Sequence, residues 1–420
     1  MPGGLDVLND TETGGSAAAT PGGGGAVAPR IMLYSHDTYG LGHIRRARTI
    51  ATALAARFEG ASILIATGSP IVGRFDFPQG VDFVRIPGVV KLPSGDYASD
   101  TMHLDIAQTV ALRERILLTT AEAFAPDIVI VDKEPTGLRG EMIPTLDHLK
   151  EQDAHIVLGL RDVLDEAGAL KTEWLRKSAG EAVEKYYDAL WIYGLSAIFE
   201  PLAGLELSDA VRARIHYTGY LRREAPEEWP EQHEAERIPA GSVLVTPGGG
   251  GDGEALIDWV LRAYEADRQL SVPALIVFGP FMNAERRTEF ERRAHRFRTI
   301  RTRNFDSRLE RLMIESRGVI AMGGYNTFCE ILSFDKPAAL APRITPRMEQ
   351  YLRIAAAEKI GLVRMLPPVQ NGAGLPDPAA MGAAIRELNQ QPLPSAAKID
   401  GLLDGLDRVC ELTRAALVGR

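Results

Sequence analysis

Short apolar runs alternate with helix-like segments along the chain from residue 30 onward, and this alternation is the strongest constraint on its fold. Several runs are continuous, as is typical of strands that are buried on both faces of a sheet. Alternating β and α elements predict an α/β protein with mostly parallel, doubly wound sheets. Strands are expected at Ile31–Tyr34, Ile63–Ala66, Phe83–Ile86, Ile128–Val131, Ile156–Leu160, Leu190–Tyr193, Ile215–Tyr217, Val243–Val245, Leu275–Phe278, Thr299–Arg301, Val319–Met322, Ala338–Ala341 and Val363–Met365.

A segment dense in Glu, Arg and Pro, residues 221–241, separates two series of strands and is predicted to be a linker. With 420 residues, the chain is long enough for two domains. We expect two Rossmann-like domains that face each other across a cleft. The predicted parts are a disordered tail (1–29), an N-terminal domain (30–220), the linker (221–241), a C-terminal domain (242–395) and a C-terminal helix (396–420). Helices are expected at His43–Phe58, Leu104–Ala123, Glu254–Arg268 and Ile399–Leu417.

Composition excludes several classes of protein. A net charge of −9 argues against a protein whose main task is coating nucleic acid. The two cysteines, Cys329 and Cys410, have neither zinc-site spacing nor a disulfide framework, which favours a reducing, cytosolic setting. No apolar run approaches the roughly 20 residues that cross a bilayer, and we expect no secretory signal.

The stretch from Gly318 to Gln350 predicts a phosphate cradle. An apolar run stops at Gly323 and Gly324, and a helix-like segment follows at once. Glycines let the backbone approach a ligand, and the first N–H groups of a helix have no partner within the helix. Helical spacing places Asn326, Thr327 and Glu330 on one face and Phe328, Ile331 and Leu332 on the other. We expect the first face to look into the cleft, where Glu330 would accept hydrogen bonds from a vicinal diol such as a ribose.

A second glycine-rich turn follows the first predicted strand and ends in Gly42 and His43. Its third glycine is missing, so it is not the dinucleotide fingerprint. A histidine at this place can act as a base near pH 7, or bind an anion when protonated, and Asp37 could orient it. Arg45 and Arg46 follow in the first helical turns and could hold a phosphate. A tight turn with a capping histidine and surface arginines explains the spacing equally well.

A third turn, Thr246 to Gly253, holds Gly249 and Gly250 between a strand and a helix. Its exposed N–H groups suit a phosphate, although a plain flexible connection remains the alternative. It lacks the Gly-Lys-Ser/Thr of a P-loop NTPase.

Further polar side chains follow predicted strands: Asp132-Lys133-Glu134 in one place, Arg161 and Asp162 in another. They would sit at the ligand-binding edge of the sheet, or form surface ion pairs. Cys329 is expected to be a small packing residue rather than a nucleophile. The histidines show no metal-ligand spacing, and the Asp-x-Asp that binds metal in single-domain nucleotide-sugar transferases is absent.

Together these motifs resemble the GT-B glycosyltransferases, and within them the family of the peptidoglycan N-acetylglucosaminyltransferase (glycosyltransferase family 28). That family has a glycine-rich turn ending in Gly-His after its first strand, as at Gly40–His43 here. Its donor motif is a small-residue turn into a helix that ends in Glu, followed by a strand, Pro, a polar loop and Gln-Gln. The matching residues are Gly323–Glu330, Pro342 and Glu349-Gln350. The run around Gly40–His43 also resembles a group of bacterial predicted glycosyltransferases of the same fold.

The resemblance implies a UDP-sugar donor and no cofactor. Glu330 would hold the ribose, the backbone from Gly323 and Gly324 through Asn326 and Thr327 would hold the diphosphate, and Glu349 and Gln350 would contact the sugar. Arg223 would lie near the donor, the backbone at Phe305 would meet the uracil, and His43 would act as a base or a phosphate ligand. Gly42, Gly249 and Gly250 complete the expected donor site; Arg45, Arg46, Arg161 and Asp162 are candidates on the acceptor side. Glu349 departs from the family, which has Gln there, and leaves the sugar undecided.

The implied function is inverting, metal-independent transfer of a hexose, with an N-acetylhexosamine as one candidate, to a glycan or lipid-linked acceptor in cell-envelope or exopolysaccharide assembly. The alternatives are a UDP-sugar 2-epimerase of the same fold and a non-catalytic nucleotide-sugar-binding protein. We expect a cytoplasmic protein and no nucleic-acid partner. A peripheral contact with the inner membrane is also considered, through a patch of Ile71-Val72 and Val89-Val90 with Lys91.

Overall fold

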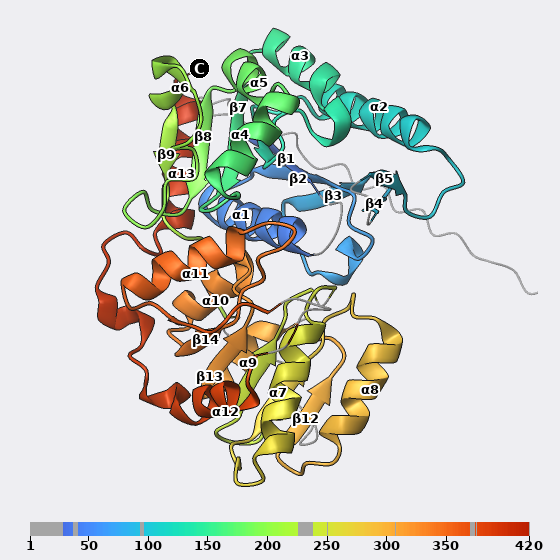
Figure 1. Ribbon diagram of the computed structural model, residues 1–420. Coiled ribbons are helices and arrows are strands. Elements are labelled where there is room, and N and C mark those ends of the chain that lie inside the picture. The colour runs from blue at the N-terminus through green and yellow to red at the C-terminus, as the bar shows by residue number, and fades with distance from the viewer. Residues whose placement is uncertain are drawn as a thin grey trace, which may run out of the picture.

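The computed structural model describes residues 28–36, 41–92, 96–225, 238–249, 251–306, 308–369, 374 and 376–419. Nearly all of the predicted tail and most of the predicted linker lie outside these residues. Figure 1 shows two lobes, each built on its own sheet, stacked one above the other. Both sheets are parallel, and the molecule has the two-domain GT-B architecture expected from the sequence.

The first sheet has the strand order β3-β2-β1-β6-β7-β8-β9, and all its pairings are parallel. Each predicted strand of the first half is present, with bounds shifted by two residues or fewer. The strands are β1 (Arg30–Ser35), β2 (Ser62–Thr67), β3 (Val81–Arg85), β6 (Ile128–Asp132), β7 (His155–Arg161), β8 (Ala189–Tyr193) and β9 (Ile215–Tyr217). A small antiparallel pair, β4 (Val89–Lys91) and β5 (Tyr97–Ser99), was not expected.

Alternate residues of β1 enter two separate cores. Ile31 and Leu33 pack with α1 (Gly42–Arg57) and α13 (Gly405–Val418), whereas Met32 and Tyr34 pack with the helices on the other face. Those helices are α2 (Ile106–Phe124), α3 (Ile143–Glu151), α4 (Ala167–Arg176), α5 (Ala179–Tyr186) and α6 (Asp209–Arg212). Because both faces of β1 are covered, the consecutive residues from Ile31 to Tyr34 are all buried, which explains the continuous apolar run in the sequence.

The second sheet has the order β12-β11-β10-β13-β14-β15, again wholly parallel. Its strands are β10 (Val243–Thr246), β11 (Ala274–Val277), β12 (Ile300–Arg303), β13 (Gly318–Ala321), β14 (Ala338–Leu340) and β15 (Arg364–Met365). Its helices are α7 (Glu254–Ala266), α8 (Ala284–Ala294), α9 (Leu309–Glu315), α10 (Tyr325–Ser333), α11 (Glu349–Lys359) and α12 (Pro378–Glu387). In both sheets the order reverses at one pair, β1/β6 and β10/β13, where ligands bind in such folds.

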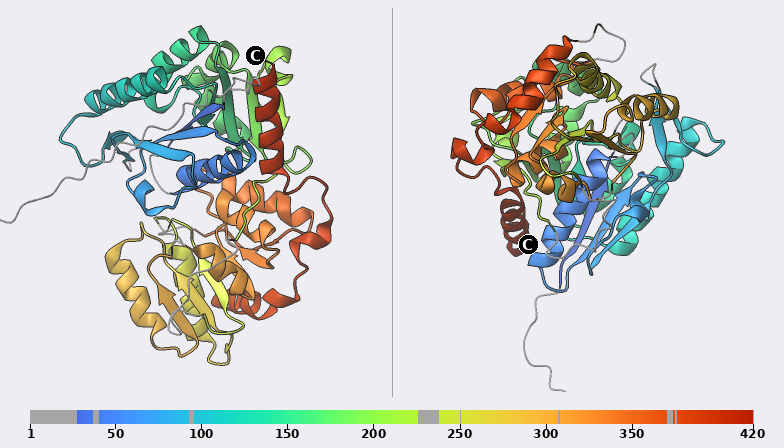
Figure 2. Two further views of the ribbon diagram at one scale, coloured as in Figure 1. Left: turned by 180° about the vertical axis from the view of Figure 1, so that it is seen from behind. Right: turned by 90° about the horizontal axis from the view of Figure 1, so that it is seen from below.

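The C-terminal helix returns to the first domain. Figures 1 and 2 show α13 beside the first sheet, and α13 contacts both α1 and β6. It begins at Gly405, six residues later than the predicted start at Ile399, because residues 399–404 form turns that include Gly401 at a φ of +71°. The expected helix therefore exists, but its first third is a turn segment.

The two chain segments that cross between the domains are hydrogen-bonded to each other. The Tyr220 N–H donates to the Leu402 carbonyl (2.8 Å), and the Gly405 N–H donates to the Tyr220 carbonyl (3.2 Å). A Cβ on Gly219 would lie 2.3 Å from the Gly401 oxygen, so only glycine permits this approach. We call the segments 218–221 and 401–405 the crossing pair.

A buried ion pair also joins the domains. The Arg353 guanidinium, on α11, donates from Nε and Nη2 to the Asp162 carboxylate, which follows β7, at 2.6–3.1 Å. Tyr220, in the crossing pair, donates its hydroxyl to Asp162 Oδ2 at 3.0 Å. Arg353 and Asp162 are both about 1 % exposed. Leaving a buried charge without its counter-charge costs far more free energy than leaving an exposed charge unpaired. Separating the domains here would break the pair, so the ion pair stabilises their contact.

Asp162→Ala is expected to lower the free energy of unfolding by about 3–5 kcal/mol, because it leaves the Arg353 guanidinium buried without a counter-charge. The free energy is measured by urea denaturation. Asp407→Ala is the matched control: it removes a carboxylate from the exposed pair with Arg57 and should cost no more than about 1 kcal/mol. Equal losses in the two variants would contradict a dominant role for the buried pair.

Candidate functional site

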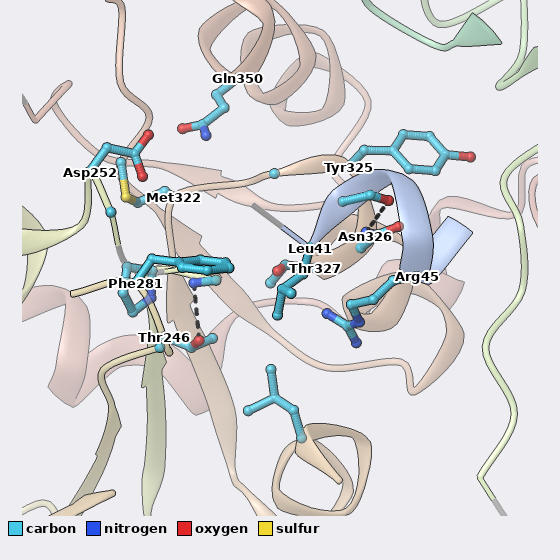
Figure 3. A pocket seen from close by; sticks show the side chains of 18 of the residues that line it. Leu41, Arg45, Thr246, Asp252, Phe281, Met322, Tyr325, Asn326, Thr327 and Gln350 are labelled. Atoms are coloured by element: carbon cyan, nitrogen blue, oxygen red, sulfur yellow. Dashed lines mark hydrogen bonds between the residues drawn. The ribbon is translucent and has the colours of Figure 1, made fainter. Parts of the chain in front are cut away.

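A cavity of about 390 Å³ lies between the two domains, at the carboxyl ends of both sheets. The first domain contributes Leu41, Gly42, His43, Arg45, Arg46, Phe75 and Arg161, and the second domain contributes the remaining lining. Figure 3 shows Asp252, Phe281 and Thr246 on one side and Arg45 on the other. The second-domain lining includes seven residues predicted from the sequence: Gly249, Phe305, Gly324, Asn326, Thr327, Glu349 and Gln350.

Other predicted residues lie behind this lining or outside the described residues. Gly323 and Glu330 are second-domain neighbours of lining residues, and Arg223 donates to Asn326 Oδ1 at 2.8 Å. Asp162 belongs to the interdomain ion pair. The other two predicted residues, Asp37 and Gly250, fall outside the described part of the chain.

His43, in the first turn of α1, is held by a carboxylate from the neighbouring strand. Its Nδ1 lies 2.5 Å from Oδ2 of Asp132, the last residue of β6. Arg46, one turn further along α1, donates to both Asp132 oxygens at 2.6 Å. Since β1 and β6 are adjacent, the switch point of the sheet brings the three side chains together. In the sequence, Asp132 was a minor candidate, and Asp37 was the residue expected to orient His43.

The electrostatics of this group set its protonation. Burial raises the pKa of the Asp132 carboxyl, but Arg46 and His43 outweigh burial and hold that pKa well below its usual range. Burial also lowers the pKa of His43 from 6.5, against an opposing effect of Asp132. At pH 7 the carboxylate is therefore ionised and the imidazole neutral. Since an ionised carboxylate can only accept a hydrogen bond, we assign the proton to Nδ1 of His43, whose N–H donates a hydrogen bond to Asp132, and Nε2 is then the basic nitrogen.

The opposite wall is the N-terminal end of α10. Gly323 has a φ of +74°, and a Cβ there would lie 2.4 Å from Ile354 Cδ1, so glycine is required. The N-cap residue, Gly324, has no side chain to cap the first N–H groups of α10. Those groups, at Tyr325 and Asn326, border the cavity and suit an anion. Asn326 also donates from Nδ2 to the Gly42 carbonyl at 3.0 Å, which fixes α10 against the start of α1.

Glu330 differs from its expected placement. Its face of α10 is covered by α1, so the side chain is fully buried rather than exposed to the cleft. Arg45 donates to Oε1 of Glu330 and, at 3.1 Å, to Glu310. The other oxygen, Oε2, is buried and accepts no hydrogen bond from a described residue. Burial raises the pKa of this carboxyl, although Arg45 opposes that rise.

Glu349 is paired to arginines from both domains. Its Oε2 accepts from Arg161 at 2.6 Å, and its Oε1 accepts from Arg343 at 2.8 Å. These arginines hold the pKa of Glu349 well below its usual range, although burial opposes them. Gln350 accepts from the Arg343 N–H at 3.2 Å, so its amide nitrogen stays available at the cavity. Arg343 itself was not predicted; it lies in a polar loop that carries no periodic signal.

The glycine turn after β10 packs against the turn after β11. Thr246 Oγ1 accepts from the Gly248 N–H at 3.2 Å, and the Gly249 carbonyl accepts from the Phe281 N–H at 3.0 Å. Gly279 has a φ of +91°, and a Cβ there would lie 2.5 Å from the Gly248 oxygen. Phe281, missed in the sequence, lines the cavity because of this contact.

Two further observations bear on the sequence expectations. Among the described residues, no group of three or more His, Cys, Asp or Glu side chains could hold a metal ion. Over the same part of the chain, no helix combines the length and apolarity that crossing a membrane requires. In the apolar patch considered for membrane contact, Val72 and Val89 are buried in the first domain, so these two side chains are not exposed to a membrane.

Searches against family models and against curated protein sequences found no match. Solved structures do match along nearly the full chain. The glycotransferase of kitacinnamycin aligns with a TM-score of 0.61 and 16% identity over 93% of this chain and 100% of its own. MurG from Acinetobacter baumannii aligns with a TM-score of 0.55 and 12% identity, over 92% of this chain and 99% of its own. A putative UDP-N-acetylglucosamine 2-epimerase from Listeria monocytogenes aligns with a TM-score of 0.59 and 13% identity, over 93% of this chain and 96% of its own. These similarities identify the fold as the GT-B fold of glycosyltransferases.

Proposed function

We propose that the protein is an inverting, metal-independent glycosyltransferase that moves a sugar from a UDP-sugar to a hydroxyl of an acceptor. One observation carries the proposal. The neutral imidazole of His43, oriented by Asp132, faces the uncapped N-terminal end of α10 across one cavity. A base on one wall and an anion site on the other are the two groups that glycosyl transfer from a nucleotide sugar needs.

In the proposed reaction, His43 Nε2 removes the proton of the acceptor hydroxyl while that oxygen attacks the anomeric carbon. The bond between the anomeric carbon and the phosphate oxygen breaks, and UDP leaves with the electron pair. The N–H groups at Tyr325 and Asn326 would stabilise the negative charge of the departing diphosphate. Asp132 remains ionised and stabilises the imidazolium that forms. Attack from the face opposite the leaving group inverts the anomeric configuration.

The resemblance of the donor motif supports UDP as the nucleotide and Glu330 as its ribose ligand. The buried Glu330 Oε2, which lacks a partner among the described residues, is a free acceptor for a ribose hydroxyl. Reaching it requires Arg45 to shift, because Arg45 lines the cavity and donates to the same carboxylate. Glu349 and Gln350 would contact the sugar, with Arg161 and Arg343 fixing the Glu349 carboxylate.

A UDP-sugar 2-epimerase is the second candidate, favoured by the Listeria structure among the similar folds. An epimerase converts its donor without an acceptor. Incubating the protein with UDP-N-acetylglucosamine alone and analysing the sugar by NMR separates the two activities: a 2-epimer indicates the epimerase. A non-catalytic binding protein would bind UDP and yield neither product, and His43→Ala would change no measured activity.

UDP is expected to protect the protein against thermal unfolding, whereas NAD and ATP are not. At UDP about 100-fold above its Kd the stabilisation should be about 2.7 kcal/mol. Glu330→Ala is expected to remove this protection, because the ribose hydroxyls lose their acceptor. Glu310→Ala is the control, since Glu310 also pairs with Arg45 but lies outside the proposed ribose site. Protection that survives in Glu330→Ala would argue against the assigned role.

The rate should depend on pH through His43. Since burial lowers the His43 pKa, the imidazole is neutral at pH 7 and is protonated only below the ordinary value of 6.5. Transfer, followed by UDP release, is therefore expected to fall off below pH 6.5 and to be flat just above it. His43→Ala should lower kcat by about 10²–10⁴-fold, the usual contribution of a general base.

The control for this prediction is His103→Ala, which changes an exposed histidine of the first domain and should leave the profile as it is. A limb above pH 7, or unchanged kcat in His43→Ala, would exclude His43 as the base.

A further inference from the structure

The carboxylate assigned to the ribose is occupied by an arginine of the other domain. Glu330, on α10, is fully buried, and its Oε1 accepts a hydrogen bond from Nη2 of Arg45, on α1. Arg45 lines the cavity, and Figure 3 shows its side chain extending from α1 toward that cavity. A ligand in the cavity therefore meets the Arg45 guanidinium before it meets the Glu330 carboxylate.

Among the described residues, no second cation is hydrogen-bonded to Glu330. Arg223, whose charge also acts on this carboxylate, donates instead from Nη1 to the Thr49 hydroxyl and from Nη2 to Asn326 Oδ1. The second carboxylate oxygen, Oε2, is buried and has no hydrogen-bond partner within the described part of the chain. A buried oxygen that accepts no hydrogen bond is costly, which points to a ligand that supplies the missing donor.

Arg45 can release Glu330 and still keep a counter-charge. The same nitrogen, Nη2, also donates to Oε1 of Glu310, on α9, at 3.1 Å. The Glu310 side chain is 23 % exposed, whereas the Glu330 side chain is fully buried. A guanidinium that gives up Glu330 therefore retains an ion pair in a more hydrated place, where a charge is less costly.

Two adjacent hydroxyls suit the carboxylate that Arg45 would leave. Without Arg45, Oε1 of Glu330 loses its donor, and Oε2 already lacks one. A vicinal diol carries two O–H donors, one for each oxygen of a carboxylate. A ligand without these hydroxyls offers no donor to Glu330, so it cannot replace the hydrogen bond from Arg45.

We propose that Arg45 is a specificity-determining residue that competes with the ribose of the nucleotide for Glu330. The assignment of Glu330 to the ribose rests on the proposed function. A nucleotide that carries both the 2′ and the 3′ hydroxyl displaces Arg45 toward Glu310, and this displacement lowers the affinity for the nucleotide. Removing the guanidinium should therefore tighten the binding of a ribonucleotide, whereas removing a phosphate ligand would weaken it.

Isothermal titration of the full chain with UDP and with 2′,3′-dideoxyuridine 5′-diphosphate tests the proposal. Arg45→Met keeps the length of the side chain and removes its donors and its charge. This variant should bind UDP about tenfold more tightly than the unaltered protein does, which corresponds to one charge-assisted hydrogen bond. It should bind the dideoxy nucleotide no more tightly, because that nucleotide has the same charge as UDP but offers Glu330 no hydroxyl.

Two further variants complete the experiment. Arg48→Met is the matched control: it removes a positive charge from α1 at a residue that donates to the Asp76 carbonyl and does not line the cavity. It should bind UDP like the unaltered protein. Arg45→Lys keeps the charge but loses the planar guanidinium, so its affinity for UDP should lie between those of Arg45→Met and the unaltered protein. Arg45→Lys also tests the proposal if Arg45→Met does not fold.

Weaker or unchanged binding of UDP in the Arg45 variants would overturn the competition between Arg45 and the ribose, and it would leave the proposed function standing. Equal tightening of the dideoxy nucleotide would also overturn the competition, because the gain would then come from vacated space and not from Glu330. If UDP binds neither to the unaltered protein nor to any Arg45 variant, the proposed function itself fails.

Discussion

The bidentate ion pair between Arg353 and Asp162 is the contact on which the arrangement of the cavity depends. It joins α11 of one domain to the end of β7 in the other, and Arg353 also donates to the Gly323 carbonyl at 3.1 Å. The same guanidinium therefore fixes the glycine turn that leads into α10. A buried guanidinium must satisfy its hydrogen-bond donors, and hydrogen bonds are directional. The relative position of the two sheets is therefore defined by the directions of the Arg353 hydrogen bonds as well as by apolar packing.

Much of the fold could be predicted because its strands are covered on both faces. Each expected run in the two sheets corresponds to a strand, and the first sheet ends with β9 at Tyr217 before the second begins with β10 at Val243. The β4–β5 pair was missed because it is short and its strand residues Tyr97–Ser99 have no buried apolar pattern. The sequence also did not predict that α13 packs on the first domain, since periodicity defines the apolar face of a helix but not the surface that this face covers.

Within the site, the sequence pointed to candidate residues from their own segment, but it did not show which side chains from other elements would contact them. His43 and the glycine turns were identified because they directly follow predicted strands. The pairing of His43 with Asp132 spans 89 residues and arises only from the adjacency of β1 and β6. Likewise, the polar face of α10 was predicted, but not that Arg45 of α1 would cover Glu330. Sequence spacing describes one element at a time, whereas these contacts depend on how the two sheets are placed.

The crossing pair has a mechanical consequence. The two chain segments are hydrogen-bonded to each other, so neither can move without the other, and the domains are joined more firmly than by two independent linkers. Tyr220 couples the crossing pair to Asp162, and so to the Arg353 ion pair. A separate set of contacts, Arg45 with Glu330 and Asn326 with the Gly42 carbonyl, joins α1 of the first domain to α10 of the second. The two domains are therefore held together at two places: the crossing pair with its buried ion pair, and the contact of α1 with α10 beside the cavity.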